Sequence, residues 1–215
     1  MGLTSLLRME GEGRAFLLIS EGTAYREAAD ALFSILRSRS RVMLLESAVI
    51  SHANWQAVSE EVAQFISAQR LKQVSLAAFG GATAIAQNLC LRHPRLVRSL
   101  VLFDVCTRPG ADLITRWIDW LEEKLPMGLP FRSRINGFDG RPFLQRLRCP
   151  VLVVSSVLAG ESEREQARLI AEGMPTAWYF QLDTGPQETE NLRRCLFDFE
   201  QIPARCPQKG QPAAR

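Results

Sequence analysis

The sequence predicts an α/β fold in which a mostly parallel central sheet is flanked by helices. Short apolar runs alternate with longer segments, and the apolar residues of those segments recur at helical spacing. Most runs are apolar on both faces, which is typical of parallel strands covered by helices on each side. We therefore expect a single domain over residues 1–202, and a chain of 215 residues is long enough to bury a substantial core.

The apolar runs predict six strands, at 15–20, 42–47, 73–79, 99–105, 150–156 and 177–182. Helices are expected within 24–40 and over 54–70, 82–92 and 162–173. In the first of these, Ala28, Leu32, Ile35 and Leu36 recur at helical spacing and form the predicted apolar face.

Residues 107–149 interrupt this alternation and are expected to form a short helical cap. They hold an amphipathic segment, "DLITRWIDWLEEKLP", followed by a stretch rich in Gly, Pro and Arg. An insertion of this kind often covers the carboxyl edge of the sheet, where open α/β proteins bind ligands. Trp117 and Trp120 either cover the cleft of the protein itself or anchor a partner. The tail at 203–215 has little to bury and is expected to be disordered.

Composition excludes several classes of function. The net charge of +3 is spread along the chain, so we expect no nucleic-acid partner. The apolar runs fall well short of the roughly 20 residues that span a bilayer, and no export signal is recognised at the N-terminus. The five cysteines are widely separated and form no C-x-x-C pair. We expect a cytoplasmic protein without metal or cofactor, whose cysteines act as small hydrophobic residues.

A sharp turn follows the third predicted strand, in "AAFGGAT" (77–83), with small residues on both sides of Gly80. This turn resembles the nucleophile elbow of the α/β-hydrolase family, whose pattern is G-x-S-x-G. The segments "LRHPRLVRSLVLFD" (91–104), "FLQRLRCPVLVVSS" (143–156) and "MPTAWYFQLDTG" (174–185) also look like family segments, in the same order and spacing. The resemblance covers about residues 14–200.

The resemblance implies that the catalytic triad of the family is missing. The family carries Ser, Cys or Asp at the elbow, where this chain has Gly80, which offers no atom for a covalent bond. The general base, a His, would stand at Pro186. The acid would fall at Leu158 or Ala159. We therefore expect no catalytic residue, and we interpret His93 as part of a helix end.

A ligand cleft is expected beside the elbow. In the family, a backbone N–H after the first matched strand helps to stabilise an oxyanion, and Glu21 and Gly22 occupy that place here. We expect Gly80 to open the space that a serine would fill. The predicted cleft residues are Glu21, Gly22, His52, Phe79, Gly80, Gly81, Trp117 and Trp120.

These observations predict a non-catalytic, hydrolase-like protein that binds a small apolar molecule or a protein partner through its cleft and cap. Exposed sheet edge also makes a homo-oligomer plausible. The alternative is an enzyme of the α/β-hydrolase superfamily that acts on a small ester-like or acyl substrate with a non-standard catalytic set.

Overall fold

The computed structural model describes residues 4–21, 25–47, 55–105, 145–156, 159, 161–183 and 187–202. The strands are β1 (Thr4–Glu10), β2 (Arg14–Glu21), β3 (Ser40–Ser47), β4 (Val74–Phe79), β5 (Val97–Phe103), β6 (Val151–Ser155) and β7 (Ala177–Gln181). The helices are α1 (Arg26–Leu36), α2 (Trp55–Ala68), α3 (Ala82–Arg92), α6 (Glu161–Gly173) and α7 (Glu188–Gln201). Residues 107–144 of the expected cap and the expected tail at 203–215 lie outside the described residues.

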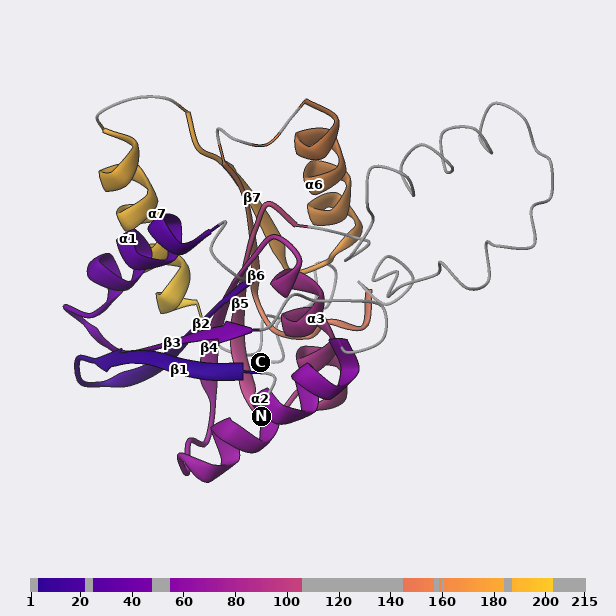
Figure 1. Ribbon diagram of the computed structural model, residues 1–215. Coiled ribbons are helices and arrows are strands. Elements are labelled where there is room, and N and C mark those ends of the chain that lie inside the picture. Colours follow the sequence, from indigo (N-terminus) through magenta and orange to yellow (C-terminus); the bar gives the residue numbers. More distant parts are fainter. Residues whose placement is uncertain are drawn as a thin grey trace, which may run out of the picture.

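The described strands form one sheet in the order β1-β3-β2-β4-β5-β6-β7 (Figure 1). Strands β2 to β7 pair in parallel, and β1 pairs antiparallel with β3. The predicted α/β fold with a mostly parallel sheet is confirmed. All six expected strands are present within a few residues of their predicted bounds.

The count of six strands was wrong, because β1 is a seventh. β1 lies at the edge of the sheet, where three of its apolar side chains, Leu6, Leu7 and Met9, are exposed. An irregularity in the pairing with β3 falls between Leu6 and Arg8 and shifts the alternation of side chains. An edge strand with charged residues and a bulge does not present the continuous apolar run from which the other strands were predicted.

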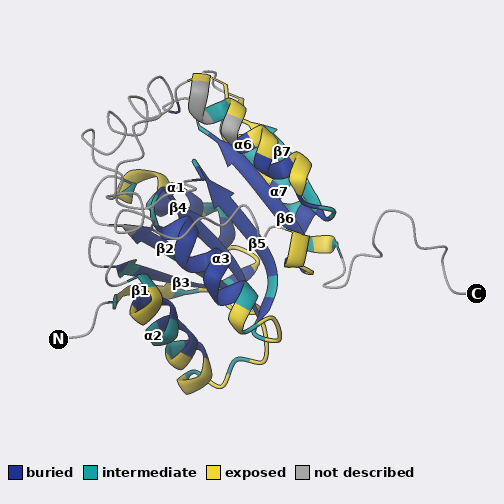
Figure 2. Ribbon diagram, turned by 90° about the vertical axis from the view of Figure 1, so that its right-hand side faces the viewer, coloured by how far each residue is buried: buried dark blue, intermediate teal, exposed yellow. Residues whose placement is uncertain are grey.

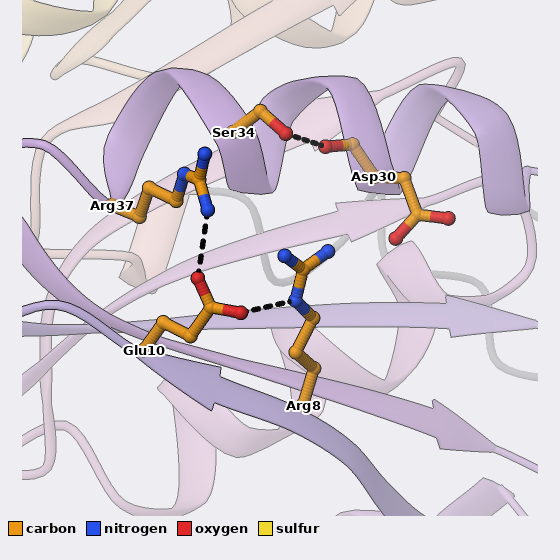
Figure 3. A network of polar contacts seen from close by, with 5 residues as sticks. All are labelled: Arg8, Glu10, Asp30, Ser34 and Arg37. Carbon is orange, nitrogen blue, oxygen red and sulfur yellow. Dashed lines mark hydrogen bonds and ion pairs between the residues drawn. The ribbon is translucent and has the colours of Figure 1, made fainter.

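Glu10, the last residue of β1, binds two arginines, one from β1 itself and one from the end of α1 (Figure 3). The two carboxylate oxygens of Glu10 accept hydrogen bonds from Arg8 Nε at 2.7 Å and from Arg37 Nη1 at 2.9 Å. Arg37 follows the last turn of α1. The antiparallel edge strand is therefore held to a helix as well as to β3.

Helices cover both faces of the sheet, with α1 and α7 on one face and α2, α3 and α6 on the other (Figure 1). Right-handed crossovers that progress in opposite directions across a sheet place their helices on opposite faces. The chain moves one way from β2 to β3 and the other way from β3 onward to β7, which explains why α1 lies on the face opposite to α2, α3 and α6. α3 is buried along nearly its whole length (Figure 2), consistent with its small and apolar residues.

Glu200, near the end of α7, binds the amino-terminal ends of two central strands. Its carboxylate accepts hydrogen bonds from Ser75 Oγ at 3.1 Å and Ser99 Oγ at 2.9 Å, and Ser99 Oγ also lies 2.8 Å from Ser75 Oγ. Arg14 and Arg98 donate to the backbone carbonyl of Glu200. Cationic groups are favourable at the carboxyl end of a helix, so this arrangement fixes α7 against the sheet.

Candidate functional site

The topology of the sheet points to the carboxyl ends of β2 and β4. These strands are neighbours, and the chain leaves them in opposite directions, to β3 on one side and to β5 on the other. In open α/β sheets, ligands bind in the crevice that such a switch in strand order creates. Tyr25, which precedes α1, and Gly80, which follows β4, are two of the described residues at this point.

The turn between β4 and α3 is built on a glycine with a positive φ. Gly80 has φ +54°, in the left-handed region that residues with a side chain rarely adopt. Its N–H donates to the carbonyl of Phe103 at 3.0 Å, and its carbonyl accepts from Thr83 N at 3.1 Å and Thr83 Oγ1 at 2.6 Å. Both backbone groups of the apex are therefore satisfied, one by β5 and the other by the first turn of α3.

The ring of Tyr25 covers the place where a side chain on Gly80 would stand. A Cβ atom built on Gly80 would lie 2.5 Å from Tyr25 Cε2 and 3.0 Å from Tyr25 Cζ. Distances under about 3.0 Å require one group to move. The expectation that Gly80 opens a space was wrong, since the aromatic ring fills it.

Three aromatic rings continue from this contact into the core. Tyr25 lies 6.1 Å from Phe79, measured between ring centroids, and Phe79 stacks on Phe103 at 4.6 Å. Both phenylalanines are buried and end β4 and β5. The apex of the turn is thus supported by an apolar floor that α1 and α7 cover on their face of the sheet.

A carboxylate and a hydroxyl meet at the next two strand ends. Asp104 follows β5 and accepts hydrogen bonds from Ser156 N at 2.7 Å and Ser156 Oγ at 2.6 Å. Asp104 also has a positive φ, +47°, which is uncommon for a residue with a side chain and is often found at functional sites. Both residues are half-buried, so the pair lies at the carboxyl edge of β5 and β6 within reach of solvent.

The structure places only part of the predicted cleft. Phe79, Gly80 and Gly81 lie together at the turn, and Glu21 ends β2, where its backbone pairs with Ser47. Ala159 is buried, and its N–H donates to the carbonyl of Ser156 at 3.2 Å. The remaining predicted positions lie outside the described residues: Gly22, His52, Trp117, Trp120, Leu158 and Pro186.

Sequence reasoning missed Tyr25, Asp104 and Ser156. Asp104 and Ser156 each directly follow an apolar strand, and this position at the end of a strand could have marked both as edge residues. Tyr25 gave no such signal, because its contact with Gly80 joins residues far apart in the chain.

The one histidine of the described residues lies away from the turn. His93 ends α3, donates its backbone N–H to Leu89 O, and places Nε2 3.2 Å from Glu60 Oε2. At a rise of about 1.5 Å per residue, it lies about 18 Å along the helix from Gly81. The interpretation of His93 as part of a helix end is therefore confirmed. Among the described residues, no group of three or more His, Cys, Asp or Glu side chains is placed to hold a metal ion.

None of the helices placed in the structure combines the length and the apolar character needed to cross a membrane. No family model matches the sequence, and no curated protein matches it.

Solved structures do resemble this protein. An alpha/beta hydrolase from Sphaerobacter thermophilus DSM 20745 is similar with a TM-score of 0.64 at 12% identity, over 92% of this chain and 96% of that one. A thermophilic esterase from Thermogutta terrifontis is similar with a TM-score of 0.66 at 16% identity, over 91% of this chain and 93% of that one. The enol-lactonase from Burkholderia xenovorans LB400 is similar with a TM-score of 0.65 at 16% identity, over 93% of this chain and 96% of that one. Together with the strand order and the tight turn at Gly80, these similarities show that the chain has the α/β-hydrolase fold.

Proposed function

We propose that this protein is a non-catalytic member of the α/β-hydrolase superfamily that binds a small apolar molecule or a protein partner through its cleft and cap. The observation that carries the proposal is the contact between Tyr25 and Gly80. Where the family elbow carries a nucleophile, this chain has a glycine beneath an aromatic ring. Covalent catalysis needs an atom that can form a bond and an open approach to it.

The other positions of the family triad support the same conclusion. Ala159, at one of the two candidate positions for the acid, is apolar and buried. Pro186, at the position of the base, cannot accept a proton on its side chain. His93 is too distant from the turn to replace it. Removing a single member of such a triad usually costs several orders of magnitude in rate, so losing all three leaves little of the family chemistry.

A binding role fits the chemistry of the turn. The half-buried ring of Tyr25, which lies against the buried rings of Phe79 and Phe103, is an apolar surface beside the turn, and apolar walls with few polar groups are typical of small-molecule sites. Trp117 and Trp120 of the cap would close over such a molecule or contact a partner, including a second copy of the chain. We propose the cytoplasm as the place where this occurs.

The alternative is an enzyme that acts on a small ester-like or acyl substrate with a non-standard catalytic set. The similar structures support it at the level of the superfamily, because their names include an esterase and an enol-lactonase. One contact favours it as well. Ser156 donates its hydroxyl to the Asp104 carboxylate at 2.6 Å, and a carboxylate can accept the proton of an attacking hydroxyl. His52 would be the remaining candidate for a base.

Hydrolysis of short-chain nitrophenyl esters separates the two functions. We expect the full-length protein to match the buffer blank. Turnover above the blank that Ser156→Ala abolishes, while Ser38→Ala in the exposed turn after α1 leaves it unchanged, would support the enzyme instead. Native mass spectrometry of protein isolated from its own host tests the binding role, and we expect a retained small molecule, a partner or a second copy. Bare monomer alone would contradict that role.

A further inference from the structure

Two cysteines that are widely separated in the sequence meet in the core. Cys90 lies in the second half of α3, and Cys149 precedes β6. Their Sγ atoms are 3.2 Å apart although the residues are 59 positions apart in the chain. Both side chains are buried, with exposed fractions of 3% and 5%. The expectation that the cysteines act as small hydrophobic residues fits this burial but did not foresee the contact.

The backbones on both sides of this contact are held in place. Cys90 belongs to a helix that is buried along most of its length. The carbonyl of Cys149 accepts a hydrogen bond from Thr176 Oγ1 at 2.9 Å. The carbonyl of the next residue, Pro150, accepts from Leu100 N, also at 2.9 Å. The two thiols are therefore brought together by the sheet and the helix.

We propose that Cys90 and Cys149 are a redox pair that closes into an intramolecular disulfide when the folded protein meets a peroxide. The sulfur atoms need to approach by about 1 Å, because an S–S bond is about 2.05 Å long. Rotation of the two side chains about their Cα–Cβ bonds can supply this movement while the backbones stay in place. Hydrogen peroxide is small enough to reach a buried thiol during fluctuations of the fold.

The reaction balances with peroxide as the only oxidant. The thiolate of one cysteine attacks a peroxide oxygen, the O–O bond breaks, and a sulfenic acid forms as hydroxide leaves. The sulfur of the second cysteine then attacks the sulfenic sulfur, the S–S bond forms, and the S–O bond breaks. Water leaves with the proton of the second thiol. The two cysteines together lose two electrons, and the peroxide is reduced to two molecules of water.

The surroundings of Cys90 and Cys149 affect the rate of disulfide formation. The hydrogen bond with Cys149, together with burial, raises the pKa of the Cys90 thiol well above its usual range. Since the thiolate is the reactive form, attack of Cys90 on peroxide is slow near neutral pH and accelerates toward alkaline pH.

Mass spectrometry tests the proposal on the full-length, folded protein. The protein is treated with hydrogen peroxide and then denatured, and its remaining thiols are alkylated. We expect two of the five cysteines to escape alkylation without any added oxygen. A peptide map is expected to join Cys90 to Cys149. Alkylation of both residues after treatment, oxygen retained on either one, or a crosslink to another cysteine would overturn the proposal, and this result needs no variant.

Matched variants sharpen the assignment. Cys195→Ser, on the half-buried cysteine of α7, is expected to leave the crosslink intact. Cys149→Ser is expected to abolish it and to leave Cys90 carrying oxygen. Because the bond closes a long loop, it constrains the unfolded chain, and the oxidised protein is expected to melt several degrees higher than the reduced one. A lower melting temperature for the crosslinked form would show that the bond strains the native core. That result would contradict the proposal that the fold places the two thiols in position to form a disulfide.

Discussion

The ring of Tyr25 lies 2.5 Å from the point where a Cβ atom on Gly80 would stand. Tyr25 precedes the first helix and Gly80 follows β4, so this contact joins the two sides of the switch in strand order. In the proposed correspondence with the hydrolase elbow, a reactive side chain would occupy the same point. The position of the Tyr25 ring is therefore consistent with the proposed loss of catalysis.

A side chain at position 80 is expected to destabilise the fold through two separable effects. Gly80→Ala places a residue with a Cβ at φ +54°, which costs about 1–2 kcal/mol, and it also displaces the Tyr25 ring. Urea unfolding of Gly80→Ala, Tyr25→Ala and the double variant measures both effects. We expect Gly80→Ala to cost less when Tyr25 is already alanine, and strict additivity would contradict the contact.

Gly173 provides the matched control for that substitution. It ends α6, no heavy atom lies within 4 Å of its virtual Cβ, and its φ is not positive. Gly173→Ala is expected to be neutral or to stabilise the fold by up to about 1 kcal/mol.

The Asp104 carboxylate is expected to stabilise the carboxyl edge by accepting two hydrogen bonds. Asp104→Ala removes the acceptor for Ser156 N and Oγ, which should lower the free energy of unfolding by about 1–3 kcal/mol. Asp104→Asn keeps an acceptor and tolerates the positive φ, so it is expected to cost less. Denaturant unfolding of both variants gives the ranking, and an asparagine variant less stable than the alanine variant would contradict this role.

Glu200 is expected to contribute more to stability than other glutamates of α7. Glu200→Ala leaves the hydroxyls of Ser75 and Ser99 without this acceptor at positions that are 1% and 3% exposed. The expected loss is about 1–3 kcal/mol. Glu190→Ala, which breaks only exposed pairs with Arg193 and Arg194, is expected to cost under about 1 kcal/mol. Equal effects of the two variants in thermal unfolding would show that Glu200 does not hold the helix in place.

The ion pairs of Glu10 are expected to make the stability of the fold depend modestly on pH. The hydrogen bonds from Arg8 and Arg37 lower the pKa of its carboxyl in the folded state. A lowered pKa means that the stabilisation is present above the unfolded-state pKa of the group and is lost as pH falls through the folded-state value. In an NMR titration, the midpoint of Glu10 is expected below that of an unpaired glutamate, and Arg37→Ala is expected to raise it. A midpoint that Arg37→Ala does not move would contradict the ion pair.

Much of the fold could be predicted from the sequence, because buried parallel strands and a buried helix carry strong apolar patterns. The helix at 82–92 has the predicted bounds, and its neighbouring strands match closely. Helical spacing alone did not settle the buried face of α1. Leu32 and Leu36 are buried as expected, but Ala29 and Phe33 complete the face instead of Ala28 and Ile35. Leu32 and Leu36 belong to two possible apolar faces of this helix, one with Ala28 and Ile35 and the other with Ala29 and Phe33. Packing of the large Phe33 ring favours the second face.

The candidate site was harder to predict, because its decisive contacts join distant parts of the chain. The turn at Gly80 could be recognised from its small residues, and its positive φ agrees with that interpretation. The ring above it belongs to a residue 55 positions earlier in the chain, and no local pattern links the two. For the same reason, the pairing of Asp104 with Ser156 and the contact of Cys90 with Cys149 could not be foreseen.

Labelling with a serine-reactive fluorophosphonate tests most directly whether the turn at Gly80 carries chemistry. The reagent bonds covalently to an activated hydroxyl, and the intact mass of the full-length protein reports every adduct. With an active esterase treated in parallel as a positive control, we predict an unchanged mass for this protein. A single adduct mapped to Ser156 or to another hydroxyl at the carboxyl edge would contradict the account and identify the protein as an enzyme.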